Sequence, residues 1–278
     1  MASPVPLATA SRNLLFRFAT AAILLPVALA AVWAGNPPLL ILTAILVLIG
    51  LWEMRSIAIA AGWGFIPWVA YPLGVAFLLL PLANTTQAIV LAAIAGAVIA
   101  AGIVASGLTS SGASRWTGLV AGIGSAFYVG GLAASLPATR GESAGLAWVL
   151  LLLAAVWAYD IAAYFTGTAI GRHRLAPRLS PNKSWEGVAG GFAGAIAAAA
   201  IVSLFVSIGL WLAVLVAALI ALASQVGDLF ESALKRWANL KDSGRLLPGH
   251  GGILDRLDSL LFAGPVAYGF AAFSSGPS

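Results

Sequence analysis

The feature that most limits the fold of this chain is its long apolar stretches, several of which run for 18 residues or more without a charge. A helical stretch of that length spans the hydrocarbon core of a bilayer. Of the 278 residues, 61% are hydrophobic and 8% are charged, whereas soluble domains carry about 25% charged residues. The sequence therefore predicts an all-α, polytopic integral membrane protein with no separate soluble domain.

Glycine, proline and charged residues divide the apolar sequence into about nine candidate transmembrane spans. These cover residues 15–34, 38–54, 65–82, 87–107, 116–137, 144–170, 187–207, 209–234 and 257–274. The first could instead be a signal peptide cleaved near Ala28–Ala30, but it is as long as a full span, and we expect it to remain. We divide the chain into a transmembrane scaffold, 1–143, and a catalytic transmembrane region, 144–278.

Lysine and arginine fall almost entirely in one set of loops. That set, which includes the N-terminal segment, holds thirteen of them, and the other set holds only Arg140. Because positive residues in short loops stay in the cytoplasm, we expect a cytoplasmic N-terminus and cytoplasmic charged loops, most simply in a bacterial plasma (inner) membrane. The net charge of +5 therefore does not indicate nucleic-acid binding. The absence of cysteine excludes thiol catalysis and cysteine-ligated metals.

The charged residues are concentrated in the C-terminal part of the chain. Residues 160–258 hold seven of the nine acidic residues, nine of the fourteen basic ones and both histidines. Asp160, Asp228 and Glu231 lie inside or at the edge of apolar spans, where a carboxylate usually faces a cavity or a partner. For Glu231 two interpretations stay open, a functional role or an ion pair with Lys235 one helical turn away.

Helical spacing places Asp228, Ser232 and Lys235 on one face, at offsets of four and seven residues. The loop that follows is rich in glycine and proline, which leaves backbone amides available to an anion. Asp255 and Asp258, three residues apart, share a face at the start of the last span.

Oxygen ligands without cysteine favour a hard cation such as Mg²⁺. Lysine and arginine beside the carboxylates favour phosphate groups. Together they indicate phosphoryl or nucleotidyl transfer to a membrane lipid.

A second basic loop covers residues 172–187. Four basic residues there are compatible with an ordinary positive-inside loop. The loop also contains Ser180–Pro181, Lys183 and Glu186–Gly187, a more specific pattern than a loop that only orients the protein by its charge needs. We therefore favour a binding role for this loop. Glycines recur four residues apart around this loop, which predicts close helix packing. The pairs are Gly167 with Gly171, Gly187 with Gly191, and Gly190 with Gly194.

The C-terminal charged stretch fills every fixed position of a known 27-residue pattern. The matching residues are Ser232–Arg236, Lys241–Asp242, Gly244, Leu247–Pro248, His250–Ile253 and Asp255–Asp258. This pattern resembles the signature of phosphatidate cytidylyltransferases, the CDP-diacylglycerol synthases. Residues 180–187 and 160–165 resemble two further blocks of that family. One departure is Ile161–Ala162, where the family usually has threonine or serine followed by glycine.

The resemblance implies an all-helical, homodimeric membrane enzyme that transfers the cytidylyl group of CTP to phosphatidate. It implies Mg²⁺, with a monovalent cation such as K⁺ beside it, and assigns the metal to Asp228 and Asp255. The residues expected to be catalytic are Asp228, Asp255, Asp258 and Lys235. Those expected to bind substrate are Asp160, Lys183, Ser232, Arg236, Lys241, Arg245, His250 and Arg256. For His250, a role as general base and a role as phosphate contact both stay open.

Two other classes compete with this prediction. An ion-coupled transporter also carries buried carboxylates and broken helices, but its site lies near the midplane, often between two related halves. Here the charges gather at one face and the two halves differ. Another lipid enzyme, such as a CTP-dependent polyprenol kinase or a CDP-alcohol phosphotransferase, is the second alternative. The latter expects Asp-Gly, then Ala-Arg and two spaced aspartates, a pattern absent from this sequence.

Overall fold

The computed structural model describes residues 22–109, 113–244, 246 and 251–275. Within them the chain is almost entirely helical. The main helices are α2 (Asn36–Ala60), α3 (Pro67–Leu79), α4 (Thr85–Thr109), α5 (Ala113–Ser125), α6 (Ser135–Gly141), α7 (Gly145–Ile170), α8 (Trp185–Ser203), α9 (Leu210–Trp237) and α10 (Leu254–Ser275). Shorter segments are the apolar helix Ala22–Ala34, the 3₁₀ turn η1 (Leu80–Leu82) and the π turn η2 (Ala126–Gly131).

Seven of the described helical segments are long and apolar enough to cross a membrane. One of them is the continuous segment Trp116–Gly141, which joins α5, η2 and α6. Two shorter apolar segments, Ala22–Ala34 and Pro67–Leu82, coincide with the remaining two predicted spans. The all-α, multi-spanning prediction is confirmed, while the count of nine and the orientation stay predictions.

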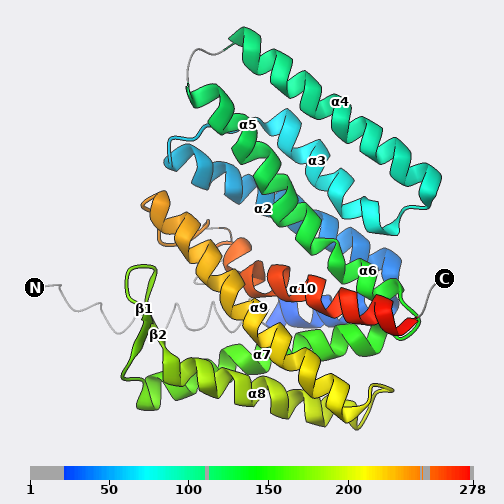
Figure 1. Ribbon diagram of the computed structural model, residues 1–278, viewed down its shortest axis with the longest axis vertical. Helices are drawn as coiled ribbons and strands as arrows, with labels where there is room; N and C mark the ends of the chain where they lie inside the picture. The colour runs from blue at the N-terminus through cyan, green and yellow to red at the C-terminus, as the bar shows by residue number, and fades with distance from the viewer. Residues whose placement is uncertain (1–21, 110–112, 245, 247–250, 276–278) are drawn as a thin grey trace, which may run out of the picture.

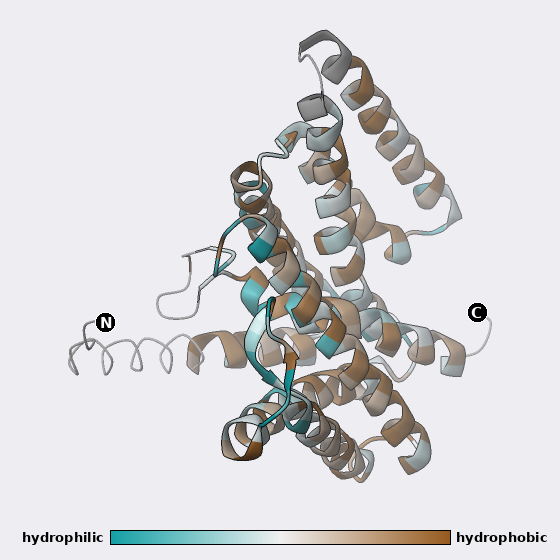
Figure 2. Cartoon of the chain, turned by 60° about the vertical axis from the view of Figure 1, so that its left-hand side comes forward, coloured by the Kyte–Doolittle hydropathy of each residue, from teal (hydrophilic) through white to brown (hydrophobic). Residues whose placement is uncertain are grey.

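The charged connections lie together at one end of the helices. In Figure 1, α7, α8, α9 and α10 run side by side, and the α7–α8 and α9–α10 connections both lie at the left. The α8–α9 connection and the α6–α7 connection lie at the opposite end. Figure 2 shows the hydrophilic colours gathered around that same charged end, while brown, apolar colour covers much of the helices. The fold thus brings the two charged loops to one face, as predicted.

Helices α7 and α8 pack closely because glycines line their contact. A Cβ added at Gly187 would lie 3.0 Å from the carbonyl oxygen of Ala163. At Gly190 it would meet the Thr166 side chain, and at Gly194 the Cβ of Ala162 at 2.5 Å. The predicted packing role of these glycines is confirmed. Behind the contact lies the largest apolar core of the described residues, which includes Trp148, Leu152, Ala217 and Ile220.

Replacing Gly191 with alanine is expected to destabilise this contact, because the new Cβ would lie 2.6 Å from the ring of Tyr159. Overpacking of this kind costs about 1–3 kcal/mol. The measurement is the thermal unfolding midpoint in detergent. Gly96→Ala is the matched control, since a Cβ there meets no described heavy atom within 4 Å. Equal midpoints for the two variants would contradict the packing role.

The α7–α8 connection is a short antiparallel hairpin, which the sequence did not predict. Strands β1 (Arg174–Ala176) and β2 (Ser180–Ser184) pair with Arg174 opposite Ser184 and Ala176 opposite Ser180. Ser184 then caps α8 by accepting a hydrogen bond from the Gly187 amide at 3.1 Å. Lys183, one residue before this cap, therefore lies on a paired strand, whose register shifts between the two residue pairs.

Candidate functional site

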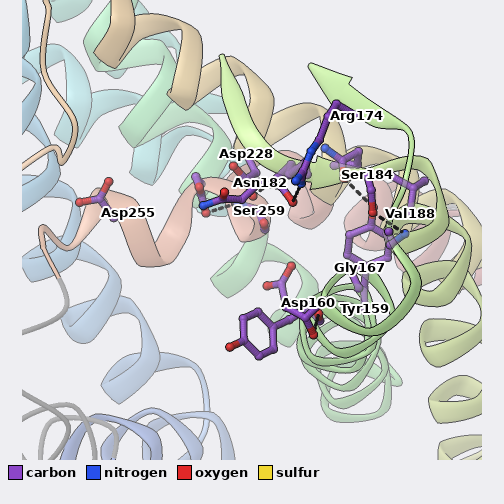
Figure 3. Close-up of a pocket in the computed structure, with 18 of the residues that line it drawn as sticks. Tyr159, Asp160, Gly167, Arg174, Asn182, Ser184, Val188, Asp228, Asp255 and Ser259 are labelled. Atoms are coloured by element: carbon purple, nitrogen blue, oxygen red, sulfur yellow. Dashed lines mark hydrogen bonds and ion pairs between the residues drawn. The ribbon is translucent and has the colours of Figure 1, made fainter. Parts of the chain in front are cut away.

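A cavity of about 770 Å³ lies where the hairpin meets α7, α8, α9 and α10. It brings together seven of the residues predicted for the site, and Figure 3 shows several of them. They are Asp160, Lys183, Asp228, Lys235, Asp255, Arg256 and Asp258. Residues up to 98 positions apart in the sequence, Asp160 and Asp258, thus face one cavity, which supports the prediction that the two charged loops act together.

Lys183 on the hairpin pairs with Asp228 on α9, with 2.5 Å between Nζ and Oδ2. Both side chains are partly exposed to the cavity. The second carboxylate oxygen of Asp228 accepts a hydrogen bond of 3.4 Å from the hydroxyl of Ser232. The predicted shared face of Asp228 and Ser232 is therefore present. Lys183 thus connects the hairpin to the charged residues of α9, which supports the predicted binding role of this loop.

Lys235 joins two carboxylates from different helices. Its ammonium lies 3.0 Å from Glu231 one turn earlier on α9 and 2.5 Å from Asp255 on α10. All three side chains are shielded, with exposed fractions of 12% for Lys235, 8% for Asp255 and 0% for Glu231. The ion-pair interpretation of Glu231 is confirmed. The pairing compensates a carboxylate that would otherwise be buried alone.

Asp255 has a hydrogen-bond donor at each of its oxygens. While Oδ1 faces Lys235, Oδ2 accepts bonds from the Ser243 amide at 3.0 Å, the Ser243 hydroxyl at 3.1 Å and the Gly252 amide at 2.8 Å. Asp255 also lies in the first turn of α10, where the helix dipole favours a negative charge. Gly251, with a φ of +80°, provides the left-handed backbone just before this turn. The orientation of this carboxylate is therefore fixed by the backbone around it.

Glu53, on α2, was missed by the sequence analysis. Its side chain is fully buried and accepts hydrogen bonds from the amides of Ile253 and Leu254 and from the Ser243 hydroxyl, each 2.8 Å long. The available signal was a lone carboxylate within an apolar span, which usually has a partner. Glu53 matches no motif and lies far in sequence from the charged region, so this signal alone does not assign it to the site.

The acidic and basic side chains of the cavity are nearly balanced. Five carboxylates line it, those of Asp160, Asp228, Asp242, Asp255 and Asp258. Four cationic side chains line it as well, those of Arg174, Lys183, Lys235 and Arg256. A polyanionic ligand therefore finds cations there, but two of the four, Lys183 and Lys235, already face carboxylates. Its charge needs a further cation for neutralisation.

The donor set fits a hard divalent cation. Among the described residues no three carboxylate or histidine side chains are grouped as a ready-made cage. Mg²⁺ does not require one, because it is usually held by one or two carboxylates together with water and substrate phosphates. Asp228 and Asp255 each turn one oxygen toward a lysine ammonium, a position that a cation already occupies. They are suited to the metal role that the resemblance implies, which stays a prediction.

Some of the predicted site residues do not line the cavity. Ser232 reaches it only through Asp228. Arg236 donates to the carbonyls of Leu179 and Leu240, at 3.2 and 3.0 Å, and so ties the end of α9 to the hairpin. Lys241 is exposed outside the cavity lining. Arg245 and His250 lie outside the described residues. The substrate-binding roles of these five residues stay predictions.

Several polar residues of the cavity were not predicted for the site. Arg174 and Asn182 line it from the hairpin, and the Tyr159 hydroxyl donates to Gln225 at 2.7 Å. Outside the cavity lining, Glu186 stabilises the start of the hairpin. Its carboxylate accepts a hydrogen bond from the His173 amide at 3.3 Å and lies 2.6 Å from the His173 ring nitrogen Nδ1. The hairpin that places Arg174 and Asn182 could not be predicted, because strands of only three and five residues leave a weak periodic pattern in the sequence.

Comparison with known proteins agrees with a site that binds phosphate groups. The sequence profile of the cytidylyltransferase family matches residues 15–274. A phosphatidate cytidylyltransferase of Brucella suis is 42% identical over 153 residues, which are 54% of this chain and 57% of the relative. Those of Pseudomonas aeruginosa and Bacillus subtilis are 54% and 43% identical over 145 and 133 residues, covering 49% and 47% of this chain and 54% and 49% of the relatives.

The chain thus spans about half the length of the curated relatives that it matches. The family profile, in contrast, extends over most of the sequence and includes both charged loops and every residue of the cavity lining. On that match, the chain belongs to the cytidylyltransferase family.

Proposed function

We propose that the protein is a phosphatidate cytidylyltransferase, which converts CTP and phosphatidate to CDP-diacylglycerol and pyrophosphate. The observation that carries this proposal is the cavity in which Lys183 of the hairpin meets Asp228 and Lys235 of α9 meets Asp255. The charge asymmetry of the loops supports a cytoplasmic site, where CTP is present. The names of the matched relatives support the same reaction.

In the proposed reaction a phosphate oxygen of phosphatidate attacks the α-phosphorus of CTP. A new P–O bond forms, the bond between the α-phosphorus and the bridging oxygen breaks, and pyrophosphate leaves with that oxygen. A phosphate monoester is largely ionised at neutral pH. The nucleophile therefore needs no strong base, and positioning and charge neutralisation supply most of the catalysis.

The cavity lysines would exchange partners when the substrates bind. Lys183 and Lys235 would turn from Asp228 and Asp255 toward phosphate oxygens, and Arg174 and Arg256 would add charge from the cavity wall. The released carboxylates would hold Mg²⁺, which supplies charge neutralisation at the CTP phosphates when bound. Lys183, Lys235, Asp228 and Asp255 would then each keep an opposite charge beside them, before and after binding.

Aromatic side chains at the cavity rim support a lipid substrate. Tyr164 lines the cavity and is 66% exposed, and Phe165 and Trp185 are similarly exposed beside the hairpin. Tyrosine and tryptophan are enriched where a membrane protein meets the head-group region. The phosphate head group can then enter the cavity while the acyl chains stay in the bilayer.

The direct test incubates the purified protein with CTP labelled in the cytidine ring, Mg²⁺ and phosphatidate. We expect label to move into the organic phase and pyrophosphate to appear in the aqueous phase in equal amount. Omitting phosphatidate should prevent both. Label in neither phase, from protein that is folded and monodisperse, would refute the proposal. A polyprenol kinase would instead release CDP, and a transporter would leave CTP intact.

A further inference from the structure

Glu53 is a buried carboxylate with no cationic partner among the described residues. Its two oxygens accept three hydrogen bonds, all from the α9–α10 connection and the first residue of α10. Oε1 accepts the Ile253 amide, and Oε2 accepts the Leu254 amide and the Ser243 hydroxyl, each at 2.8 Å. Among the described residues, each donor to Glu53 thus lies 190 to 201 positions later in the sequence.

The surroundings of Glu53 supply hydrogen-bond donors to both of its buried carboxylate oxygens. A carboxylate without a partner in an apolar interior costs several kcal/mol. Here two of the donors are amides at the beginning of α10, where the helix dipole adds positive potential. The carboxylate and the helix end therefore compensate each other, and each loses its partner if the other moves.

Glu53 is linked to Asp255 through a single side chain. The Ser243 hydroxyl lies 2.8 Å from Glu53 and 3.1 Å from Asp255, and the Ser243 amide donates to Asp255 as well. The backbone also approaches Glu53 too closely for side chains. A Cβ at Gly244 would lie 2.6 Å from Glu53 Oε1, and one at Gly252 would collide with Glu53 and Ser243. The presence of Glu53 thus explains why glycine stands at positions 244 and 252.

We propose that Glu53 is a positioning residue, which holds the α9–α10 connection and the start of α10 so that Asp255 faces Lys235 and the cavity. The carboxylate acts through Ser243 and the α10 backbone and does not line the cavity itself. A residue of an N-terminal helix thereby sets the geometry of a site whose lining comes from α7 to α10. The kinetic part of this inference rests on the proposed cytidylyl transfer, whereas the structural part does not.

The first test is hydrogen exchange of the Glu53→Gln variant, followed by mass spectrometry. Glutamine has nearly the same shape, but its amide group replaces one acceptor oxygen with a donor. We expect peptides covering Ser243 and Leu254 to exchange at least tenfold faster than in the wild type, and α7–α8 peptides to be unchanged. Thr43→Val is the matched control, because it removes a buried hydrogen bond within α2, to the Leu39 carbonyl. Unchanged exchange in Glu53→Gln would overturn the inference.

The second test separates positioning from general stability by kinetics. We expect kcat of Glu53→Gln to fall about 10- to 100-fold, as for residues that orient a metal-binding or catalytic side chain, with the KM for CTP within about twofold. Thr43→Val should keep the wild-type kcat. A variant with reduced thermal stability but wild-type kcat in its folded fraction would overturn the positioning role.

Ser243→Ala provides a second route if Glu53→Gln does not fold. It removes only the hydroxyl that joins the two carboxylates, and we expect a lower kcat with normal assembly. In the double variant the losses should be smaller than the sum of the single losses, because both changes break one network. Additive losses would contradict the link. Absence of turnover in the wild type would refute the proposed function alone, since the exchange experiment tests Glu53 without turnover.

Discussion

Replacing Asp255 with asparagine is expected to lower kcat by about 100- to 1,000-fold, the range seen when one charge-stabilising group is removed from an active site. Asparagine keeps the size of the side chain but brings an NH₂ group to a position surrounded by donors. Lys235, the Ser243 amide and the Gly252 amide all point at this carboxylate. The variant therefore loses a negative charge for Lys235 and for the proposed Mg²⁺.

The rate of Asp255→Asn is measured as initial velocity over a range of Mg²⁺ concentrations, with size-exclusion chromatography to confirm folding. Glu142→Gln is the matched control, because it makes the same carboxylate-to-amide change in the α6–α7 connection, at the opposite end of the helices from the cavity. It should leave the rate unchanged. Near-normal turnover of folded Asp255→Asn would reject the assignment of Asp255 to the reaction.

Replacing Lys235 with methionine is expected to destabilise the protein as well as to inactivate it. Lys235 is the ion-pair partner of Glu231, whose side chain is fully buried. Removing one member of a buried pair costs about 3–5 kcal/mol, because the other charge is left uncompensated. Because methionine fills much of the same volume as lysine, the loss of stability reflects the missing charge more than a change in packing.

A second substitution separates the two effects of Lys235. Adding Glu231→Gln to Lys235→Met removes the uncompensated carboxylate, and we expect the unfolding midpoint to recover much of the loss. Activity should not recover, since Asp255 and the substrate phosphates still lack the ammonium. Thermal unfolding and the CTP assay on the single and double variants give both quantities. Recovery of activity in the double variant would show that Lys235 has only a structural role.

The parts of the site predictable from sequence were those encoded by short-range spacing. Asp228 and Ser232, and Glu231 and Lys235, are one helical turn apart, so that their contacts follow from the helix alone. The gathering of charge after residue 160 likewise identified the end of the helices that carries the cavity. The family pattern then added expected roles for single residues.

Contacts across the fold could not be predicted in the same way. The pair of Lys183 with Asp228 depends on a hairpin whose register is set by cross-strand pairing. Arg236 looked like a phosphate ligand because of its position in the charged stretch, yet its guanidinium bonds to two backbone carbonyls. Glu53 depends on the beginning of a helix far along the chain. The number of residues between two such positions does not predict the distance between them in the folded protein.

The contacts of Glu53 also have a consequence for how the protein is made. Ile253, one of its donors, is synthesised 200 residues later, an interval on the order of 10 to 40 seconds at translation rates of about 5–20 residues per second. During that time α2 carries a carboxylate whose insertion into a bilayer costs about 2.5–3.5 kcal/mol, without the donors of the finished fold. The α9–α10 connection and the start of α10, which are synthesised after α2, thus supply the donors that Glu53 lacks until then, and a nascent chain that ends before residue 243 leaves this carboxylate without them.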